Sequence, residues 1–254
     1  MNTLWPMIFC LFLLACHAKD HSILTIQASA FPQAEILHVI KDDLEKEGVH
    51  LRILIVDDYN LPNRALAEGE IDANFFQHCP FLQEQIAQFH YPLAALTEVH
   101  IEPMGLYLHA KKLSLNAKIS LPNDPTNQTR ALLLLEKGGY IRLDARKNIL
   151  STLDIVENPL HLQFYEVDAA LLARTLDDVD ASIIPTNYAL TAKLSPIHDA
   201  ILKEDASSLY ANIIAIRKTE CDRPELLLLK KYVTSKKVQD FINTHYEGAV
   251  LPVY

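Results

Sequence analysis

The strongest constraint on the fold is an alternation of strand-like and helix-like segments along the chain. Residues 22–29 (SILTIQAS) alternate apolar and polar side chains, as a strand does. The next stretch, QAEILHVIKDDLEKEG, ends at Gly48 and puts one apolar face on a helix, formed by Ile36, Leu37, Ile40 and Leu44. A strand at 50–56, a short helix at 63–68 and a strand at 71–76 follow. This order predicts a parallel sheet covered by helices.

The pattern then completes one unit and starts a second. PFLQEQIAQF predicts a helix, LAALTEV and MGLYLHA predict strands, and we place a lobe boundary near Leu106. From residue 117 the order strand, helix, strand, helix, strand, helix is read again in AKISLP, PTNQTRALLLLEK, HLQFYEV, DAALLARTL, ASII and NYALTAKL. A strand at 211–217 and amphipathic helices at 224–234 and 236–245 end the chain. Two such α/β units predict two lobes, joined by two crossings, with a ligand cleft between them.

The predicted first lobe comprises residues 22–106 together with 208–254, and the second comprises residues 107–207. Residues 1–15 form an apolar run that is too short to span a bilayer comfortably, so they are predicted to be a signal peptide. The adjoining Leu-Leu-Ala-Cys resembles the bacterial lipobox, which predicts a lipid on Cys16 and a tether at residues 16–21. An ordinary cleaved signal or a misassigned start codon is the alternative.

Composition excludes several classes of function. The formal net charge is -9 and no basic run is interleaved with aromatic residues, which argues against a nucleic-acid partner. Nucleotide-binding glycine motifs and the common hydrolase and metalloprotease motifs are absent from the sequence, so we expect neither an enzyme nor a cofactor. His78-Cys79 and His100-x-Glu102 come nearest to a metal site, but structural roles are favoured for them. Cys79 and Cys221 could pair or stay reduced.

The segment NDPTNQTRALLLL predicts a helix start and an anion site. Asp124 is a preferred capping residue and Pro125 suits the first helical position, so the helix is predicted to begin at about Pro125 and to end at Gly138-Gly139. Asn127 and Arg130 share one face near the positive end of the helix. Arg130 could grip a carboxylate bidentately while Asn127 donates beside it. The alternative is a surface helix with a solvated arginine.

A second candidate wall lies in DANFFQHCPFL, residues 72–82, where a strand ends and Pro80 opens a helix. Phe76 and His78 point to the same face of that strand. An aromatic ring and a neutral hydrogen-bonding group at a strand end can form one wall of an apolar pocket, whereas Phe76 taken singly suits a core position.

Several motifs together resemble one known family. They are DYNLPNRALAEGEIDANFFQHCPFL, EVHIEPMGLY, NDPTNQTRALLLL, DIVENP, LDDVDASIIPTNYAL, YANIIAIR and the ending YEGAVLPVY. Their order is that of the methionine-binding lipoprotein family, the substrate-capturing subunits of bacterial methionine ABC importers, and the likeness covers nearly all of residues 23–254.

The resemblance implies a two-lobed periplasmic-binding-protein-like fold of type II, with two crossover connections and a cleft for a free amino acid. It assigns the ligand carboxylate to Arg130, with Asn127 beside it. The other residues that it places around the ligand are Tyr59, Phe76, His78, Asn187 and Asn212. Phe81 stands where the family usually has tyrosine, which keeps an aromatic wall but removes a hydroxyl. The loop ASAFPQAEIL also departs from the family pattern.

The implied function is that of a lipid-anchored protein of the bacterial cell envelope. It would bind L-methionine, or a close relative such as D-methionine or a methionyl dipeptide, and deliver it to an ABC permease with its ATPase subunit. Ligand binding would close the two lobes. Two alternatives stay open: a surface lipoprotein whose drifted cleft serves protein-protein contact, motivated by Phe81 and the altered first loop, and a metal-capturing lipoprotein.

Overall fold

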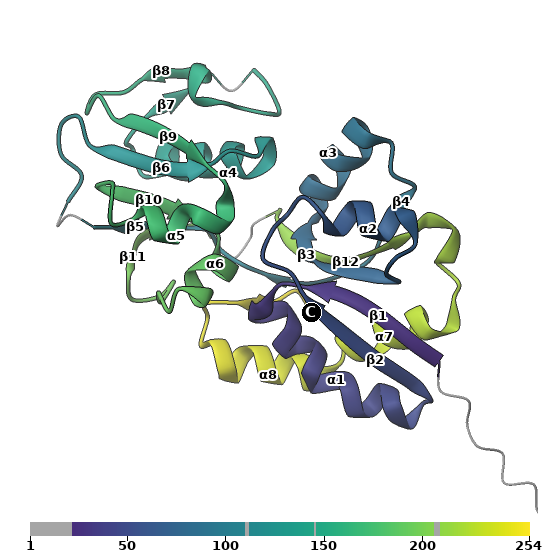
Figure 1. Ribbon diagram of the computed structural model, residues 1–254. Coiled ribbons are helices and arrows are strands. Elements are labelled where there is room, and N and C mark those ends of the chain that lie inside the picture. The colour runs from purple at the N-terminus through teal and green to yellow at the C-terminus, as the bar shows by residue number, and fades with distance from the viewer. Residues whose placement is uncertain (1–21, 110–111, 145, 206–208) are drawn as a thin grey trace, which may run out of the picture.

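The computed structural model describes residues 22–109, 112–144, 146–205 and 209–254. Figure 1 shows two sheets side by side, each covered by helices. The predicted signal peptide at residues 1–15, the tether at 16–21 and the candidate lipidation site Cys16 lie outside the described residues. No helix in the described ranges is long and apolar enough to cross a membrane.

The first sheet is mixed, not parallel as the sequence predicted. Its strands, in spatial order, are β13 (Leu251–Pro252), β4 (Leu93–Ile101), β12 (Ala211–Arg217), β3 (Ala73–His78), β1 (Ser22–Ala28) and β2 (Val49–Ile55). β1 pairs in parallel with β2 and β3, as alternation with helices predicts. β12 enters between β3 and β4 and is antiparallel to both. Apolar periodicity along a strand contains no information about the direction of its neighbour, so this pairing could not be predicted.

Helices cover both faces of the first sheet. One face carries α1 (Glu35–Lys46), α7 (Pro224–Val233) and α8 (Lys236–Tyr246), and the other carries α2 (Pro62–Glu68) and α3 (Cys79–Phe89). The central strand β12 is buried on both sides. Its Ile214 and Ile216 join the core under α1, α7 and α8, while Ile213 and Ala215 join the core under α2 and α3. The predicted face Ile36, Leu37, Ile40 and Leu44 of α1 is fully buried.

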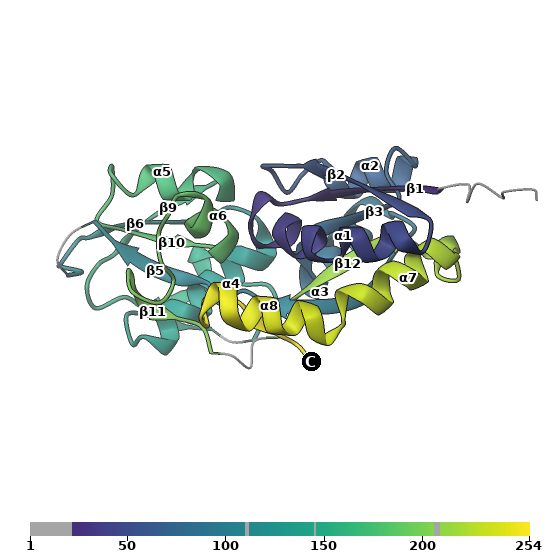
Figure 2. The same ribbon diagram turned by 90° about the horizontal axis from the view of Figure 1, so that it is seen from below.

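The second sheet holds β11 (Ala200–Lys203), β5 (Gly105–Leu108), β10 (Ala181–Ile184), β6 (Lys118–Pro122) and β9 (Gln163–Val167), in that order. α4 (Pro125–Lys137) packs on one face, and α5 (Leu172–Thr175) and α6 (Thr186–Thr191) pack on the other. A small antiparallel ladder of β7 (Arg142–Leu143) and β8 (Ile155–Glu157) lies beside this sheet. Figure 2 shows the two helix-covered sheets lying side by side from a second direction.

The chain passes between the sheets twice, as expected for a two-lobed fold. The first crossing runs from β4 to β5, and the second runs from β11 to β12. β5 begins at Gly105, so the strand of the second sheet starts just before the predicted boundary near Leu106. The exact limits of the two lobes stay a prediction. Cys79 and Cys221 are free thiols, and Cys221 is exposed.

The sequence missed several short elements. A turn of π-helix over Ala30–Ala34 precedes α1, and the edge strands β11 and β13 were not predicted. The segment predicted as one helix over DAALLARTL is a 3₁₀ turn, Ala169–Leu171, followed by the short α5. Short elements of this kind depend on their neighbours for stability, so local patterns indicate them weakly.

Candidate functional site

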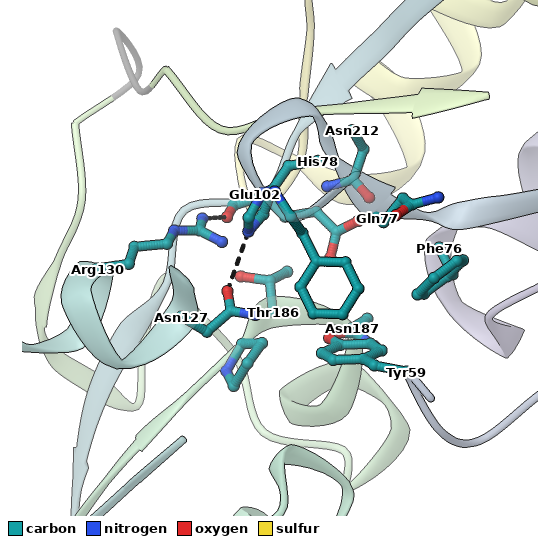
Figure 3. Close-up of a pocket in the computed structure, with 12 residues that line it drawn as sticks. Tyr59, Phe76, Gln77, His78, Glu102, Asn127, Arg130, Thr186, Asn187 and Asn212 are labelled. Atoms are coloured by element: carbon teal, nitrogen blue, oxygen red, sulfur yellow. Dashed lines mark hydrogen bonds between the residues drawn. The ribbon is translucent and has the colours of Figure 1, made fainter. Parts of the chain in front are cut away.

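A cavity lies between the two sheets, and about 330 Å³ of empty space, part of it open to solvent, lies inside it. Its lining residues come from both lobes and from a crossing segment: Tyr59, Phe76, Gln77, His78, Phe81, Glu102, Asn127, Arg130, Pro185, Thr186, Asn187 and Asn212. All eight residues that the sequence placed in the ligand site are among them, and Figure 3 shows the cavity.

Three aromatic rings form the apolar wall. Tyr59 lies in the loop after β2, Phe76 is in β3, and Phe81 is in the first turn of α3. Their ring centroids are 5.8–6.0 Å apart, and the Phe76 and Phe81 rings meet edge to face. The loop that carries Tyr59 is shaped by Asp58, whose Oδ1 accepts the N–H groups of residues 60 and 61. The family departure at Phe81 therefore leaves an intact aromatic wall.

The predicted helix start is confirmed. α4 spans Pro125–Lys137, and the Asp124 side chain accepts the Asn127 N–H at 2.9 Å. Both polar atoms of the Asn127 side chain have protein partners, because its Nδ2 donates to both Asp124 oxygens and its Oδ1 lies 3.1 Å from His78 Nε2. Asn127 thus links α4 of the second lobe to β3 of the first.

His78 is a neutral donor. The Phe81 N–H donates to its Nδ1 at 3.1 Å, so the ring proton is on Nε2, which donates to Asn127. Burial, followed by the charge of Arg130, lowers the pKa of His78 from 6.5 to about 3. The imidazole stays uncharged at physiological pH and fixes the distance between the two lobes at this edge of the cavity.

Arg130 is buried rather than solvated, with 4% of its surface exposed. Its Nε and Nη2 donate to Glu204 at 2.7 and 2.6 Å, and Nη2 also donates to the Glu102 carbonyl at 2.5 Å. Burial opposes the charge, but the nearby carboxylates of Glu204 and Glu102 hold the pKa of Arg130 above its ordinary value. The bidentate edge that we expected to grip a ligand carboxylate is occupied by Glu204, whereas Nη1 has no hydrogen-bond partner among the described residues. Glu204 also accepts the Met104 N–H, and so joins the two crossing segments.

Asn187 and Thr186 add polar groups to the cavity from the first turn of α6. The Tyr59 hydroxyl donates to Asn187 Oδ1 at 2.8 Å, which is a second bond between the lobes. Asn187 Nδ2 is then left to donate. Thr186 is fully buried and donates to the Pro103 carbonyl at 2.6 Å, which holds the start of α6 against the first crossing.

Glu102 was not predicted to line the cavity. The sequence suggested only that it could bind a metal together with His100, and a structural role was favoured. Glu102 follows β4 directly, is 4% exposed, and accepts from Gln33 Nε2 at 2.6 Å and from His100 Nε2 at 2.7 Å. The same Gln33 nitrogen donates to Asn212 Oδ1 at 3.1 Å. Gln33 comes from the first loop, where the sequence departs from the family pattern. The position of Glu102 at a strand end, before a proline, was the available signal.

The described ranges contain no group of three or more His, Cys, Asp or Glu side chains placed to hold a metal ion. His100 and Glu102 bond to each other inside the protein instead.

Comparisons with known proteins agree on one family. The model of the NlpA lipoprotein family matches residues 24–254. The chain is 40% identical over 240 residues to the methionine-binding lipoprotein MetQ of Bacillus subtilis, covering 91% of this chain and 88% of that protein. It is 37% identical over 249 residues to the probable D-methionine-binding lipoprotein MetQ of Vibrio cholerae, covering 95% and 93%. The structure is similar to that of a nutrient-binding protein from Burkholderia cenocepacia bound to methionine, with a TM-score of 0.88, 40% identity, and coverage of 91% of this chain and 100% of that one.

Proposed function

The chain belongs to the NlpA lipoprotein family, and on that basis we propose that it captures methionine in the cavity between its lobes and delivers it to an ABC importer. The partners in this role are a membrane permease and its ATPase subunit. A lipid on Cys16 would hold the protein at a membrane of the cell envelope. Binding and delivery of the ligand involve no covalent chemistry.

The observation that carries the proposal is the pairing of an aromatic wall with a buried arginine in one small cavity. Tyr59, Phe76 and Phe81 supply polarizable, apolar surface for a thioether, and each sulfur-ring contact contributes about 0.3–1.5 kcal/mol. Arg130 lines the opposite part of the same cavity and supplies a positive charge for a carboxylate. A free amino acid with a thioether at the end of its side chain and a carboxylate at its α-carbon fits this division.

Closure of the lobes follows from where the cavity residues lie. His78 bonds to Asn127 and Tyr59 bonds to Asn187, and each bond joins one lobe to the other at the cavity. A ligand that contacts both walls favours the arrangement in which these bonds are made. The closed form would then be the one that the permease recognises.

The protein as purified, without refolding, is expected to carry methionine. To check this, the protein is denatured and the small molecules that it releases are identified by mass spectrometry. The control is the solution separated from the same protein while it is still folded. Methionine at close to one molecule per chain supports the proposal. A different small molecule at that occupancy contradicts it.

A further inference from the structure

Strand β3 shifts its register at the residue that gives the cavity one of its aromatic rings. Residues 213–214 of β12 pair with Gln77 and Phe75, so Phe76 is an extra residue and the strand bulges there. In a regular strand, Asn74 and Gln77 would point to opposite faces, because they are three residues apart. The bulge turns both amides to the face that α2 covers. Figure 3 shows Gln77 next to Phe76 at the cavity.

Asn63, Asn74 and Gln77 form a buried cluster of side-chain amides, which we call the amide triad. Asn63 Nδ2 donates to Gln77 Oε1 at 2.8 Å, and Asn63 Oδ1 accepts from Asn74 Nδ2 at 3.0 Å and from Gln77 Nε2 at 2.6 Å. Gln77 Nε2 also donates to Asn74 Oδ1 at 2.9 Å. Every polar side-chain atom of the triad therefore has a partner within it. Because hydrogen bonds are directional and a buried amide is costly when unpaired, the triad favours one relative position of α2 and β3.

The triad also holds the segment that carries Tyr59. Helix α2 begins at Pro62, three residues after Tyr59, and Asn63 is the second residue of the helix. Asn74 Nδ2 donates to the Pro62 carbonyl at 3.2 Å, so β3 holds the helix start by its backbone as well as by the Asn63 side chain. The short connection from Tyr59 to this anchor limits how far the ring can move.

Tyr59 links the geometry of this anchor to the cavity. Its ring centroid lies 5.8 Å from that of Phe76, and its hydroxyl donates to Asn187 of the second lobe at 2.8 Å. A displacement of the Tyr59 segment would therefore disturb both the aromatic wall and a hydrogen bond between the lobes.

We infer that the amide triad is a positioning device that holds Tyr59 against the bulge at Phe76 and so sets the affinity of the aromatic wall for the ligand's thioether. This inference rests on the proposed capture of methionine. In the described part of the chain, the lining of the cavity includes Gln77 but neither Asn63 nor Asn74. Asn63 and Asn74 are thus positioning residues that act through Tyr59.

A double-mutant cycle of Asn63→Leu and Tyr59→Ala tests the inference, with L-methionine titrated calorimetrically into refolded, ligand-free protein. Leucine has nearly the shape of asparagine but forms no side-chain hydrogen bond, so it breaks the triad. With Tyr59 present, Asn63→Leu is expected to lower the affinity about tenfold, a loss comparable with that of one sulfur-ring contact. In the Tyr59→Ala background it is expected to lower the affinity less than twofold, because the ring that the triad positions is absent. A tenfold loss in both backgrounds overturns the inference.

Asn158→Leu is the matched control. The Asn158 side chain donates to the Leu162 carbonyl at 3.0 Å and accepts the Leu162 N–H at 2.8 Å, in the second lobe between β8 and β9. Its replacement also removes amide hydrogen bonds, but it is expected to leave the affinity for methionine unchanged.

If Asn63→Leu does not fold, Asn74→Leu carries the same cycle. This variant keeps both hydrogen bonds between Asn63 and Gln77, so a smaller loss of about threefold is expected, again only when Tyr59 is present. Wild-type affinity in the folded variant overturns the inference, even though methionine still binds to the wild type. Failure of the wild type itself to bind methionine overturns the proposed function, and the inference with it.

Discussion

Replacing Arg130 with alanine is expected to weaken methionine binding by at least about 30-fold. The guanidinium is the positive group of the cavity, and removing one partner of a buried charge pair costs about 2–5 kcal/mol, where every 1.4 kcal/mol is a factor of ten. Calorimetric titration of refolded protein measures the change. Arg142→Ala is the matched control, because Arg142 pairs with Glu157 at the surface and both side chains are about 60% exposed.

The same substitution also leaves the Glu204 carboxylate, which is 12% exposed, without its partner. The free energy of unfolding is therefore expected to fall by about 3–5 kcal/mol. The double variant Arg130→Ala/Glu204→Ala separates the two effects: it should recover much of the stability lost in the single variant, as measured by urea denaturation, but none of the affinity. Wild-type affinity in a folded Arg130→Ala protein would remove Arg130 from the ligand site.

The second large effect is a loss of stability at acid pH that is caused by the buried His78. In the unfolded chain a histidine takes up its proton near pH 6.5, whereas in the folded protein the pKa of His78 is about 3. Between these values the unfolded state binds one more proton, so the contribution of His78 to stability is present above pH 6.5 and is lost as the pH falls toward 3. The slope from this one group is at most about 1.4 kcal/mol per pH unit.

The variant His78→Gln has no titrating group at this position. Between pH 6 and pH 4, its free energy of unfolding is therefore expected to fall by about 2 kcal/mol less than that of the wild type. Urea denaturation of the ligand-free proteins at several pH values gives the difference. His50→Gln serves as the control, because His50 is exposed and lies at 3.1 Å from Glu45. Equal acid sensitivity in wild type and His78→Gln would show that His78 is not held neutral by burial.

The features that were predicted correctly are those determined by residues close together in the sequence. The start of α4 depends on Asp124 and Pro125, which are adjacent in sequence, and the structure confirms it. The apolar face of α1 follows from a period of 3.6 residues and is confirmed in the same way. The antiparallel insertion of β12 depends instead on strands more than a hundred residues away, and the sequence interpretation of a parallel sheet was wrong.

The site residues show the same difference between local features and contacts that are distant in sequence. The strand end at Phe76 and His78 could be recognised from spacing, and the family motifs added Tyr59, Asn187 and Asn212. The bond from Arg130 to Glu204 spans 74 residues, and the donation from Gln33 to Asn212 spans 179. Partners at such distances are set by the packing of the two lobes, so their roles emerge from the structure alone.

The central claim, that the cavity between the lobes holds methionine, is tested most directly by titrating the refolded, ligand-free protein with L-methionine. The account predicts saturable binding with one site per chain and an affinity that falls sharply in Arg130→Ala. Glycine, which has the same polar groups but no thioether for the aromatic wall, should bind far more weakly. A folded wild-type protein that shows no binding of methionine, or that binds glycine equally well, would contradict the account.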